Sequence, residues 1–290
     1  MVRIAAIGLV VPPFPALGQN GSTTLPDIVV TATRSARKPF DLPSSIDAVN
    51  LQNLQADRVS INPSESLREV PGVLARDRQN AAQDEQISIR GFGARTTFGV
   101  RGVRLYVDGI PATMPDGQGQ LSNFSLGASD RIEVLRGPFS ALYGNSSGGV
   151  IQLFTADGTD PPEWRAMFGA GRYAGQRVEL GTRGIAGGLD YNVDLSRLRS
   201  DGFRRHSRSE RDNGNARLRF TLGDGSRITV VANSVLVPHA QDPKGLTRQE
   251  YLVDPRQAAA SALLYDTRKS VRQNQAGLIL EHDDNHGGQC

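Results

Sequence analysis

Regular alternation of apolar and polar residues in the second half of the chain constrains the fold more than any other feature. Residues 189–196 read LDYNVDLS, residues 216–222 read ARLRFTL, and residues 227–233 read RITVVAN. Because successive side chains of a strand point to opposite faces, each segment predicts a β-strand with one apolar face. The turn sequence GDGS predicts a hairpin between the second and third segments. Weaker versions of the pattern occur at residues 164–168, 178–180 and 276–280.

Two architectures produce such strands: a transmembrane β-barrel, and a soluble antiparallel sheet with one wet face. Two observations favour the barrel. The polar face carries repeated arginines and aspartates, as a water-filled lumen would, and long polar insertions at residues 199–215 and 239–273 alternate with tight turns. About five or six strands fall short of the roughly eight of the smallest bacterial barrels. Since residues 282–290 are also polar, we expect the sequence to be a fragment.

Composition removes several other classes of protein. The mean hydropathy is −0.35, and the longest apolar run, residues 4–11, is too short for a membrane-spanning helix. The net charge is +3 with scattered arginines, which disfavours a nucleic-acid surface. The single cysteine, Cys290, excludes an internal disulfide within this sequence.

The first 35 residues carry an export signal and an isolated strand. Residues 1–18 have a positive residue, an apolar stretch and small residues near Gly18, which predicts a secretory signal peptide. Residues 19–35 form a linker around a β-branched segment that has no hairpin partner. This segment is either an edge strand of the next domain or a strand that a partner protein pairs with through its backbone. Its residues are Asp27, Ile28, Val29, Val30, Thr31, Ala32 and Thr33.

Residues 36–158 predict a compact α+β domain. Asn62, Pro63 and Glu65 have the spacing of a capped helix start, and Pro71 with Gly72 ends that helix. We expect a long exposed loop at residues 112–120. Strands are predicted at residues 86–90, 103–107, 132–135 and 150–154.

Three catalytic or ion-binding interpretations of this domain are weak. Residues 144–149, GNSSGG, lack the lysine and the spacing of a phosphate-binding loop. The four histidines lie in loop-like or terminal positions, which disfavours a Ser-His-Asp hydrolase. Asp108 and Asp116 each precede glycine, and Asp-Gly is first of all a turn signal rather than a pair of metal ligands.

Ligand binding by exposed loops is the fourth interpretation. Arginines and amides beside an aromatic ring bind anionic, planar ligands well. The plain alternative, ordinary solvated loop polarity, stays equally open on these grounds. The candidate residues are Arg95, Phe98, Arg101, Met114, Asp116, Gln118 and Gln120.

Several stretches, in order, resemble the TonB-dependent receptors of Gram-negative outer membranes. Residues 27–33, DIVVTAT, resemble the TonB box, and residues 87–92, ISIRGF, resemble a motif of the plug domain. Further plug motifs are matched by YVDGIP at residues 106–111, IEVLRGPFSALYG at residues 132–144 and GGVI at residues 148–151. The resemblance covers residues 27–155 and the beginning of the barrel.

The resemblance implies an α+β plug domain, residues 36–158, followed by the first antiparallel strands of a transmembrane β-barrel, residues 159–290, with 22 strands in the family. It implies an exported, monomeric, outer-membrane transporter that contacts outer-membrane lipid and has no enzymatic activity and no cofactor. TonB and its inner-membrane energising complex would pull on the box while a small ligand is held by the apical loops. Arg90 and Arg136 would dock the plug against acidic residues of the barrel, because a buried guanidinium needs a partner.

Within the family, residues 93–120, 233–257 and 266–269 look most like the transporters of pyrroloquinoline quinone. Many relatives carry ferric siderophores, so both ligand classes are expected candidates. The alternative from another class is a periplasmic α+β ligand-binding or signalling module followed by a soluble sheet, without transport.

Overall fold

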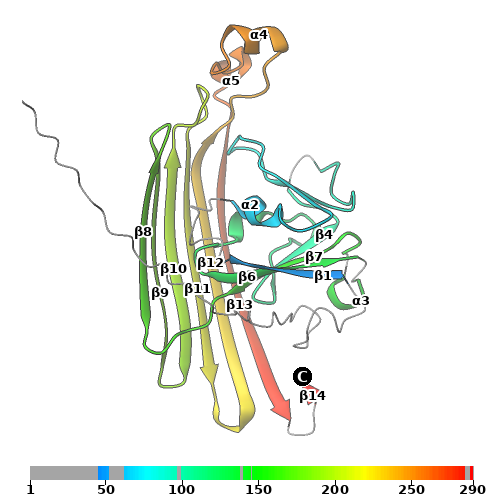
Figure 1. The fold of residues 1–290 in the computed structure, drawn as a ribbon, viewed down its shortest axis with the longest axis vertical. Coiled ribbons are helices and arrows are strands. Elements are labelled where there is room, and N and C mark those ends of the chain that lie inside the picture. Colours follow the sequence, from blue (N-terminus) through cyan, green and yellow to red (C-terminus); the bar gives the residue numbers. More distant parts are fainter. Residues whose placement is uncertain are drawn as a thin grey trace, which may run out of the picture.

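The computed structural model describes residues 45–51, 62–96, 99–137, 140–144, 146–284 and 288–289. They form two parts that lie side by side, an inner domain of described residues up to Thr155 and a tall curved sheet that we call the wall (Figure 1). The expected signal peptide and the TonB box, residues 27–33, lie outside the described residues, so both stay predictions.

The inner domain contains two sheets and short helices. Its main sheet has the strand order β1-β6-β7-β4-β5, in which β4 and β7 run parallel and the other pairs antiparallel. A second sheet pairs β2 with β3. The elements are β1 (Ser45–Asn50), α2 (Pro63–Leu67), β2 (Val73–Arg76), β3 (Gln86–Ile89), β4 (Val103–Val107), β5 (Ile110–Pro111), η2 (Leu121–Asn123), β6 (Ser129–Arg136), α3 (Ser140–Tyr143) and β7 (Gly149–Thr155).

Each strand predicted in this region is present, with β4 at its expected bounds. The Glu65 carboxylate accepts a hydrogen bond from the backbone N–H of Asn62, 3.0 Å away. The start of α2 was therefore predicted correctly from the sequence. The helix ends at Leu67, before the predicted Pro71-Gly72 stop, and turns carry the chain onward. Its apolar side chains pack with those of both sheets in one core, which includes Leu67, Val70, Ile87, Ile89, Leu105, Ile132 and Leu153.

The wall is an antiparallel meander in the order β14-β13-β12-β11-β10-β9-β8. Short turns join the strands at one end, which we call the turn end. At the other, the loop end, residues 172–174 form a short turn and residues 201–208 and 242–267 form longer connections (Figure 1). Its strands are β8 (Glu163–Gly171), β9 (Gly175–Ala186), β10 (Leu189–Ser200), β11 (Ser209–Thr221), β12 (Ser226–Gln241), β13 (Arg268–Asp284) and β14 (Gly288–Gln289).

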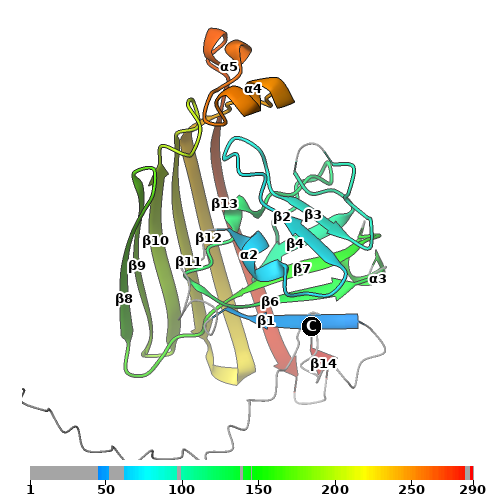
Figure 2. The same ribbon diagram turned by 45° about the horizontal axis from the view of Figure 1, so that its top comes forward.

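The two faces of the wall differ as the alternation predicted. Many side chains that point away from the inner domain are apolar and exposed, with Trp164 at 83% and Phe168 at 71% of full exposure. Most of the buried side chains that face the inner domain are polar, among them Glu179, Asn192, Asp194, Asn215, Arg217 and Asn233. Figure 2 shows the inner domain against the concave side of this curved sheet.

The predicted polar insertions are much shorter than expected. Residues 199–215 belong largely to β10 and β11, and residues 239–273 lose both ends to β12 and β13. Polar side chains do not interrupt a strand, because the backbone ladder continues whatever the side chains are. The true connections are residues 201–208 and residues 242–267, which contain α4 (Arg248–Val253) and α5 (Ala260–Leu264). None of the helices in the described ranges is long and apolar enough to cross a membrane.

Candidate ligand cavity and inner-domain docking site

Arg136, the arginine of the IEVLRG segment, has its partners within the inner domain. Its Nη2 forms an ion pair of 2.6 Å with Asp47 of β1, and its Nη1 donates to the carbonyl of Pro71, 2.7 Å away. Arg90 is exposed and has a left-handed backbone, with φ of 50°. Docking of these two arginines against acidic barrel residues therefore stays a prediction.

The glycines after this segment allow close packing of the chain. Gly149 has a φ of +138°, and a Cβ there would lie 2.1 Å from the carbonyl oxygen of Leu135 on the neighbouring strand. A Cβ on Gly148 would lie 2.5 Å from the Cβ of Phe92. Backbone contact thus accounts for these two glycines without a bound phosphate.

One transverse row of the wall, which we call the upper row, grips the inner domain through polar side chains. Strand register aligns its members across β8 to β13: Arg165, Gly181, Asp194, Asn215, Asn233 and Gln275. Asp194 accepts a hydrogen bond from Ser125 of the inner domain at 2.9 Å and pairs with Arg165 at 3.0 Å. At the other end of the row, Gln275 donates to the carbonyl of Pro111 at 2.6 Å.

The next row towards the turn end, the lower row, holds the end of β7 and the turn after β4. Its Asn192 donates to the carbonyls of Ala128 and Ala156, at 3.2 and 2.9 Å. Gly277 of the same row leaves space for Ile110, whose Cδ1 would lie 2.5 Å from a Cβ at that position. The full row is Glu163, Arg183, Asn192, Arg217, Val231 and Gly277.

Arg217 of the lower row binds the chain where the inner domain leads into the wall. It donates to the carbonyls of Thr155 at 3.0 Å and Ala156 at 3.2 Å, and its Nη2 lies 2.8 Å from Asp157 and 3.2 Å from Asp190. Burial opposes ionisation of Asp157, but the charges of Arg217 and Arg219 outweigh it and lower the pKa of that carboxyl. The junction is therefore held by charge as well as by the peptide chain.

Asp108, once considered as a metal ligand, has a structural role. Its carboxylate accepts hydrogen bonds from the backbone N–H of Thr155 at 2.7 Å and from the Thr155 hydroxyl at 2.6 Å. Burial raises the pKa of Asp108, although these bonds oppose the shift. Within the described ranges, no group of three or more His, Cys, Asp or Glu side chains could hold a metal ion.

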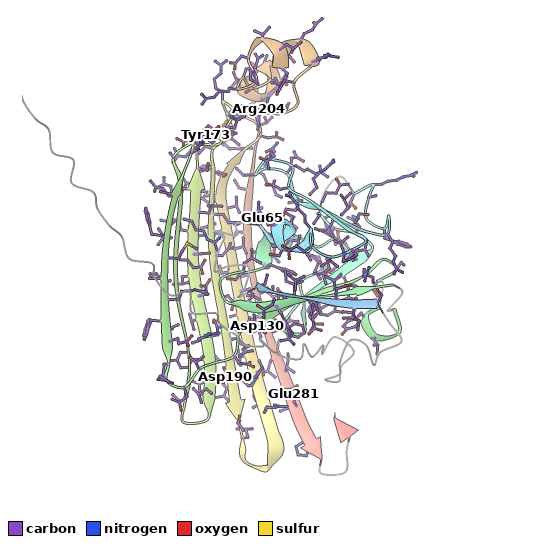
Figure 3. The ribbon with its side chains drawn as sticks, in the orientation of Figure 1. Glu65, Asp130, Tyr173, Asp190, Arg204 and Glu281 are labelled. Carbon is purple, nitrogen blue, oxygen red and sulfur yellow. The ribbon has the colours of Figure 1, made fainter. Side chains whose placement is uncertain are left out.

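A cavity of about 840 Å³ opens between the inner domain and the loop end of the wall. The inner domain contributes the β2–β3 connection, with Asp77, Gln79, Asn80, Gln83, Asp84 and Glu85, together with Asn62, Glu65 and Gln120. The wall contributes Tyr173, Arg177, Phe203, Arg204, Arg211 and Lys269. Figure 3 shows Tyr173 and Arg204 at the loop end and Glu65 lower, on the inner domain.

The cavity has opposite charges on its two sides. The inner domain presents carboxylates, and the wall presents mainly guanidinium groups, with one ammonium group and the carboxylate of Glu210. Burial raises the pKa of Glu85, while a backbone hydrogen bond from Ser64 and the charge of Arg211 oppose the shift. Lys269 bonds to Asp84, so one pair already crosses the cavity. A ligand with polar groups on two sides would meet complementary charge on both.

The connections at the loop end hydrogen-bond to each other and to the β2–β3 connection. Arg204 donates to three carbonyls, those of Gln257, Lys244 and Pro243. The rings of Tyr173 and Phe203 meet edge to face, with centroids 5.7 Å apart. Asp242 accepts from Asn80 and Gln83, both at 2.8 Å, and these bonds together with that of Lys244 outweigh burial to lower its pKa.

The predicted ligand-binding residues divide into two groups. Gln120 lines the cavity. Arg101, Asp116 and Gln118 bond to one another at an exposed site, with 3.4 Å from Arg101 to Asp116 and 3.2 Å from Arg101 to Gln118. Arg95 and Met114 are exposed outside the cavity lining, and Phe98 lies outside the described residues. A ligand role for these residues stays a prediction.

Sequence reasoning missed most of the cavity lining. The β2–β3 connection reads DRQNAAQDE at residues 77–85, which is dense in carboxylates and amides and lies between the predicted helix and the strand predicted at residues 86–90. That density is the signal that could have indicated a binding loop. The wall residues of the cavity carry no such local signal, because Arg177, Arg204 and Arg211 come from three different strands or connections.

Comparison with known proteins identifies the inner domain. Residues 38–150 match the family model described as "TonB-dependent Receptor Plug Domain". The chain is 33% identical over 158 residues to the iron-regulated outer membrane virulence protein of Vibrio cholerae, across 51% of this chain and 22% of that protein. It is 30% identical over 154 residues to the hemin receptor of Yersinia pestis, across 52% and 20% of the two chains. The match thus spans about a fifth of each relative.

Solved structures show the same fold. The ferric yersiniabactin uptake receptor FyuA from Yersinia pestis superposes with a TM-score of 0.64 and 23% identity, over 83% of this chain and 39% of that one. The location expected from the sequence, the bacterial outer membrane, agrees with that of these relatives. Residues 38–150 are therefore a plug domain of the TonB-dependent receptor type, packed against antiparallel strands with the fold of the receptors' barrel.

Proposed function

We propose that the protein takes part in TonB-dependent transport of a scarce iron complex across the outer membrane. The cavity of about 840 Å³ between the β2–β3 connection and the wall carries this proposal. Its volume suits a small-molecule complex, and Asp242 of one loop-end connection and Lys269 of β13 already bond to the inner domain beside it. The relatives named for iron regulation and hemin support iron as the cargo.

Residues 27–33 are proposed to pair with TonB as an added strand, driven through its inner-membrane energising complex. A β-branched segment on a polar linker can offer its backbone ladder to a partner. Force applied there would reach the inner domain through β1, which pairs only with β6 within the described sheet. No enzymatic activity is part of the proposal.

Pyrroloquinoline quinone is the narrower ligand hypothesis. The wall side of the cavity carries Arg177, Arg204 and Arg211 beside the rings of Tyr173 and Phe203. Guanidinium groups next to aromatic rings suit a planar, anionic quinone. Hemin, which combines a planar ring with carboxylates, suits the same groups, so titration has to decide between them.

The alternative of a soluble periplasmic module fits the wall poorly. Its outward face exposes Trp164, Phe168, Leu195, Leu278 and Leu280 at 59–83% of full exposure. A soluble sheet would leave this large apolar patch in water, whereas a bilayer covers it.

The test is titration of the intact receptor with hemin, ferric siderophores and pyrroloquinoline quinone, followed by uptake in cells. Tyr173→Ala removes a ring from the cavity and should weaken binding of the true ligand about tenfold. Tyr251→Ala, an exposed tyrosine of α4 outside the cavity lining, is the matched control. Equal binding by both variants, or no binding of any iron complex, would refute the proposal.

A further inference from the structure

On β10 and β11 the outward face of the wall changes from apolar to charged at one row. On β10, Leu189, Tyr191, Val193 and Leu195 point outward, and the next outward residue is Arg197. On β11 the outward residues change from Gly214 to Asp212 at the same level, because Arg197 and Asp212 are register partners. Arg272 of β13 lies in this row too, through Leu236. On β10 and β11 this row marks the boundary of the lipid-facing band at the loop end, whereas its members on β8, β9 and β12 are the apolar Phe168, Val178 and Leu236.

Arginines gather at this boundary on β10 and β11. Arg197 pairs with Asp212 through both Nε and Nη2, at 2.6 and 2.8 Å. Arg199 and Arg208 both reach Glu210, at 3.1 and 2.7 Å. Three guanidinium groups share two carboxylates, so this outward cluster keeps a net charge of +1 (three positive, two negative).

The pairing orients the guanidinium groups without using all their donors. A guanidinium has five N–H groups. The bonds of Arg197 to Asp212 involve Nε and Nη2, and Nη1 has no partner within the described residues. The side chains of Arg197 and Arg208 are 63% and 51% exposed. The cluster therefore presents preorganised donors directly above an apolar band.

We propose that this cluster binds the phosphorylated headgroup of a lipid in the outer leaflet of the outer membrane. Apolar strand faces would contact the acyl chains, while Arg197 and Arg208 would donate to phosphate oxygens. Arginine suits this role because its planar fork matches the geometry of phosphate oxygens. The orientation of the loop end towards the cell exterior rests on the proposed function.

The test uses native mass spectrometry of the full-length receptor in detergent, titrated with bisphosphorylated lipid A, its dephosphorylated form and inorganic phosphate. The double variant R197Q/R208Q should lose about tenfold in affinity for the bisphosphorylated lipid. R197K/R208K should bind with an affinity between those of the wild type and R197Q/R208Q, since the charge is kept and the planar fork is lost. The matched control R205Q/R248Q removes two cations from the connections beyond the strands and should bind the lipid like the wild type.

Equal affinity for the dephosphorylated lipid, an equal loss in the control, or binding of inorganic phosphate as tight as that of the lipid would each overturn the proposal. Arg199 and Glu210 of the cluster also line the cavity, but the two substituted residues, Arg197 and Arg208, do not. Loss of iron-complex binding in the Tyr173→Ala receptor is therefore a separate readout, so the lipid site and the transport function can fail independently.

Discussion

The inner domain packs apolar side chains between its two sheets, whereas the wall turns apolar side chains outward and keeps polar ones within. Leu105 in the first is fully buried, while Leu195 in the second is 59% exposed. The two parts meet through polar groups, such as Asp194 with Ser125 and Asn192 with two carbonyls. The difference teaches that this interface is built more like a contact between two proteins than like one continuous core.

The largest expected effect comes from the buried charge at the junction. Arg217→Ala removes a buried guanidinium that bonds to two carbonyls and to the carboxylate of Asp190, which keeps only the backbone of Gly158 and the more exposed Arg219. The free energy of unfolding of the inner domain should therefore fall by about 4 kcal/mol. Urea titration, monitored by hydrogen exchange of residues 150–158, measures it. Arg219→Ala, which shares both carboxylates but is more exposed, should cost clearly less. Equal losses would mean that the contacts of Arg217 with the carbonyls are unimportant.

Leucine truncation on the two sides sharpens the comparison. Leu105→Ala should lower the free energy of unfolding of the inner domain by about 3 kcal/mol, because the side chain is fully enclosed. Leu195 faces away from the inner domain. Leu195→Ala should therefore leave the free energy of unfolding of the inner domain within about 0.5 kcal/mol of the wild-type value. The same urea titration compares them. A large loss of stability in Leu195→Ala would contradict the outward orientation of that side chain.

A glycine at the interface gives the next largest effect. A Cβ on Gly127 would lie within contact distance of the Glu179 carboxylate, which Arg165 and Arg177 hold in place. Gly127→Ala should therefore cost about 2 kcal/mol through displacement of that ion pair. Gly171→Ala, where a Cβ meets nothing within 4 Å, is the control in thermal unfolding. An unchanged unfolding temperature in Gly127→Ala would show that the Glu179 side chain moves aside at little cost.

The smallest effect is a dependence on pH. Burial raises the pKa of Glu85, so the folded state binds this proton more tightly than the unfolded state. Stability is then lost as pH rises from the ordinary glutamate pKa through the raised one. Glu85→Gln should match the wild type below this interval and exceed it above. Unfolding titrations of both proteins across pH measure the difference, and identical pH profiles would contradict the prediction.

The sequence predicted strands well because their signal is local. Alternation at residues 189–196 and the GDGS turn located β10 and the β11–β12 hairpin. The prediction failed at residues 199–215, where polar side chains on both faces concealed the continuing β-strands. A period-two pattern reports the environment of each face, and beyond the lipid band both faces are polar.

The site was harder to predict than the fold. Gln120 was identified, yet the carboxylates and amides of residues 77–85 were not, because their partners Asp242 and Lys269 lie more than 150 residues away in the chain. The partner of Arg136 was also expected on the barrel, and the structure pairs this arginine with Asp47. Local motifs reveal which residue types are present, whereas their pairing depends on how sheets pack.

The inside-out arrangement of the wall is tested most directly at Trp164, an exposed outward residue of β8. The measurement is tryptophan fluorescence of the receptor in vesicles with brominated acyl chains or with aqueous iodide, compared between the wild type and Trp164→Phe. We predict a component that bromine quenches, that iodide leaves unchanged, and that disappears in Trp164→Phe. Quenching of this component by iodide and not by brominated lipid would contradict the account.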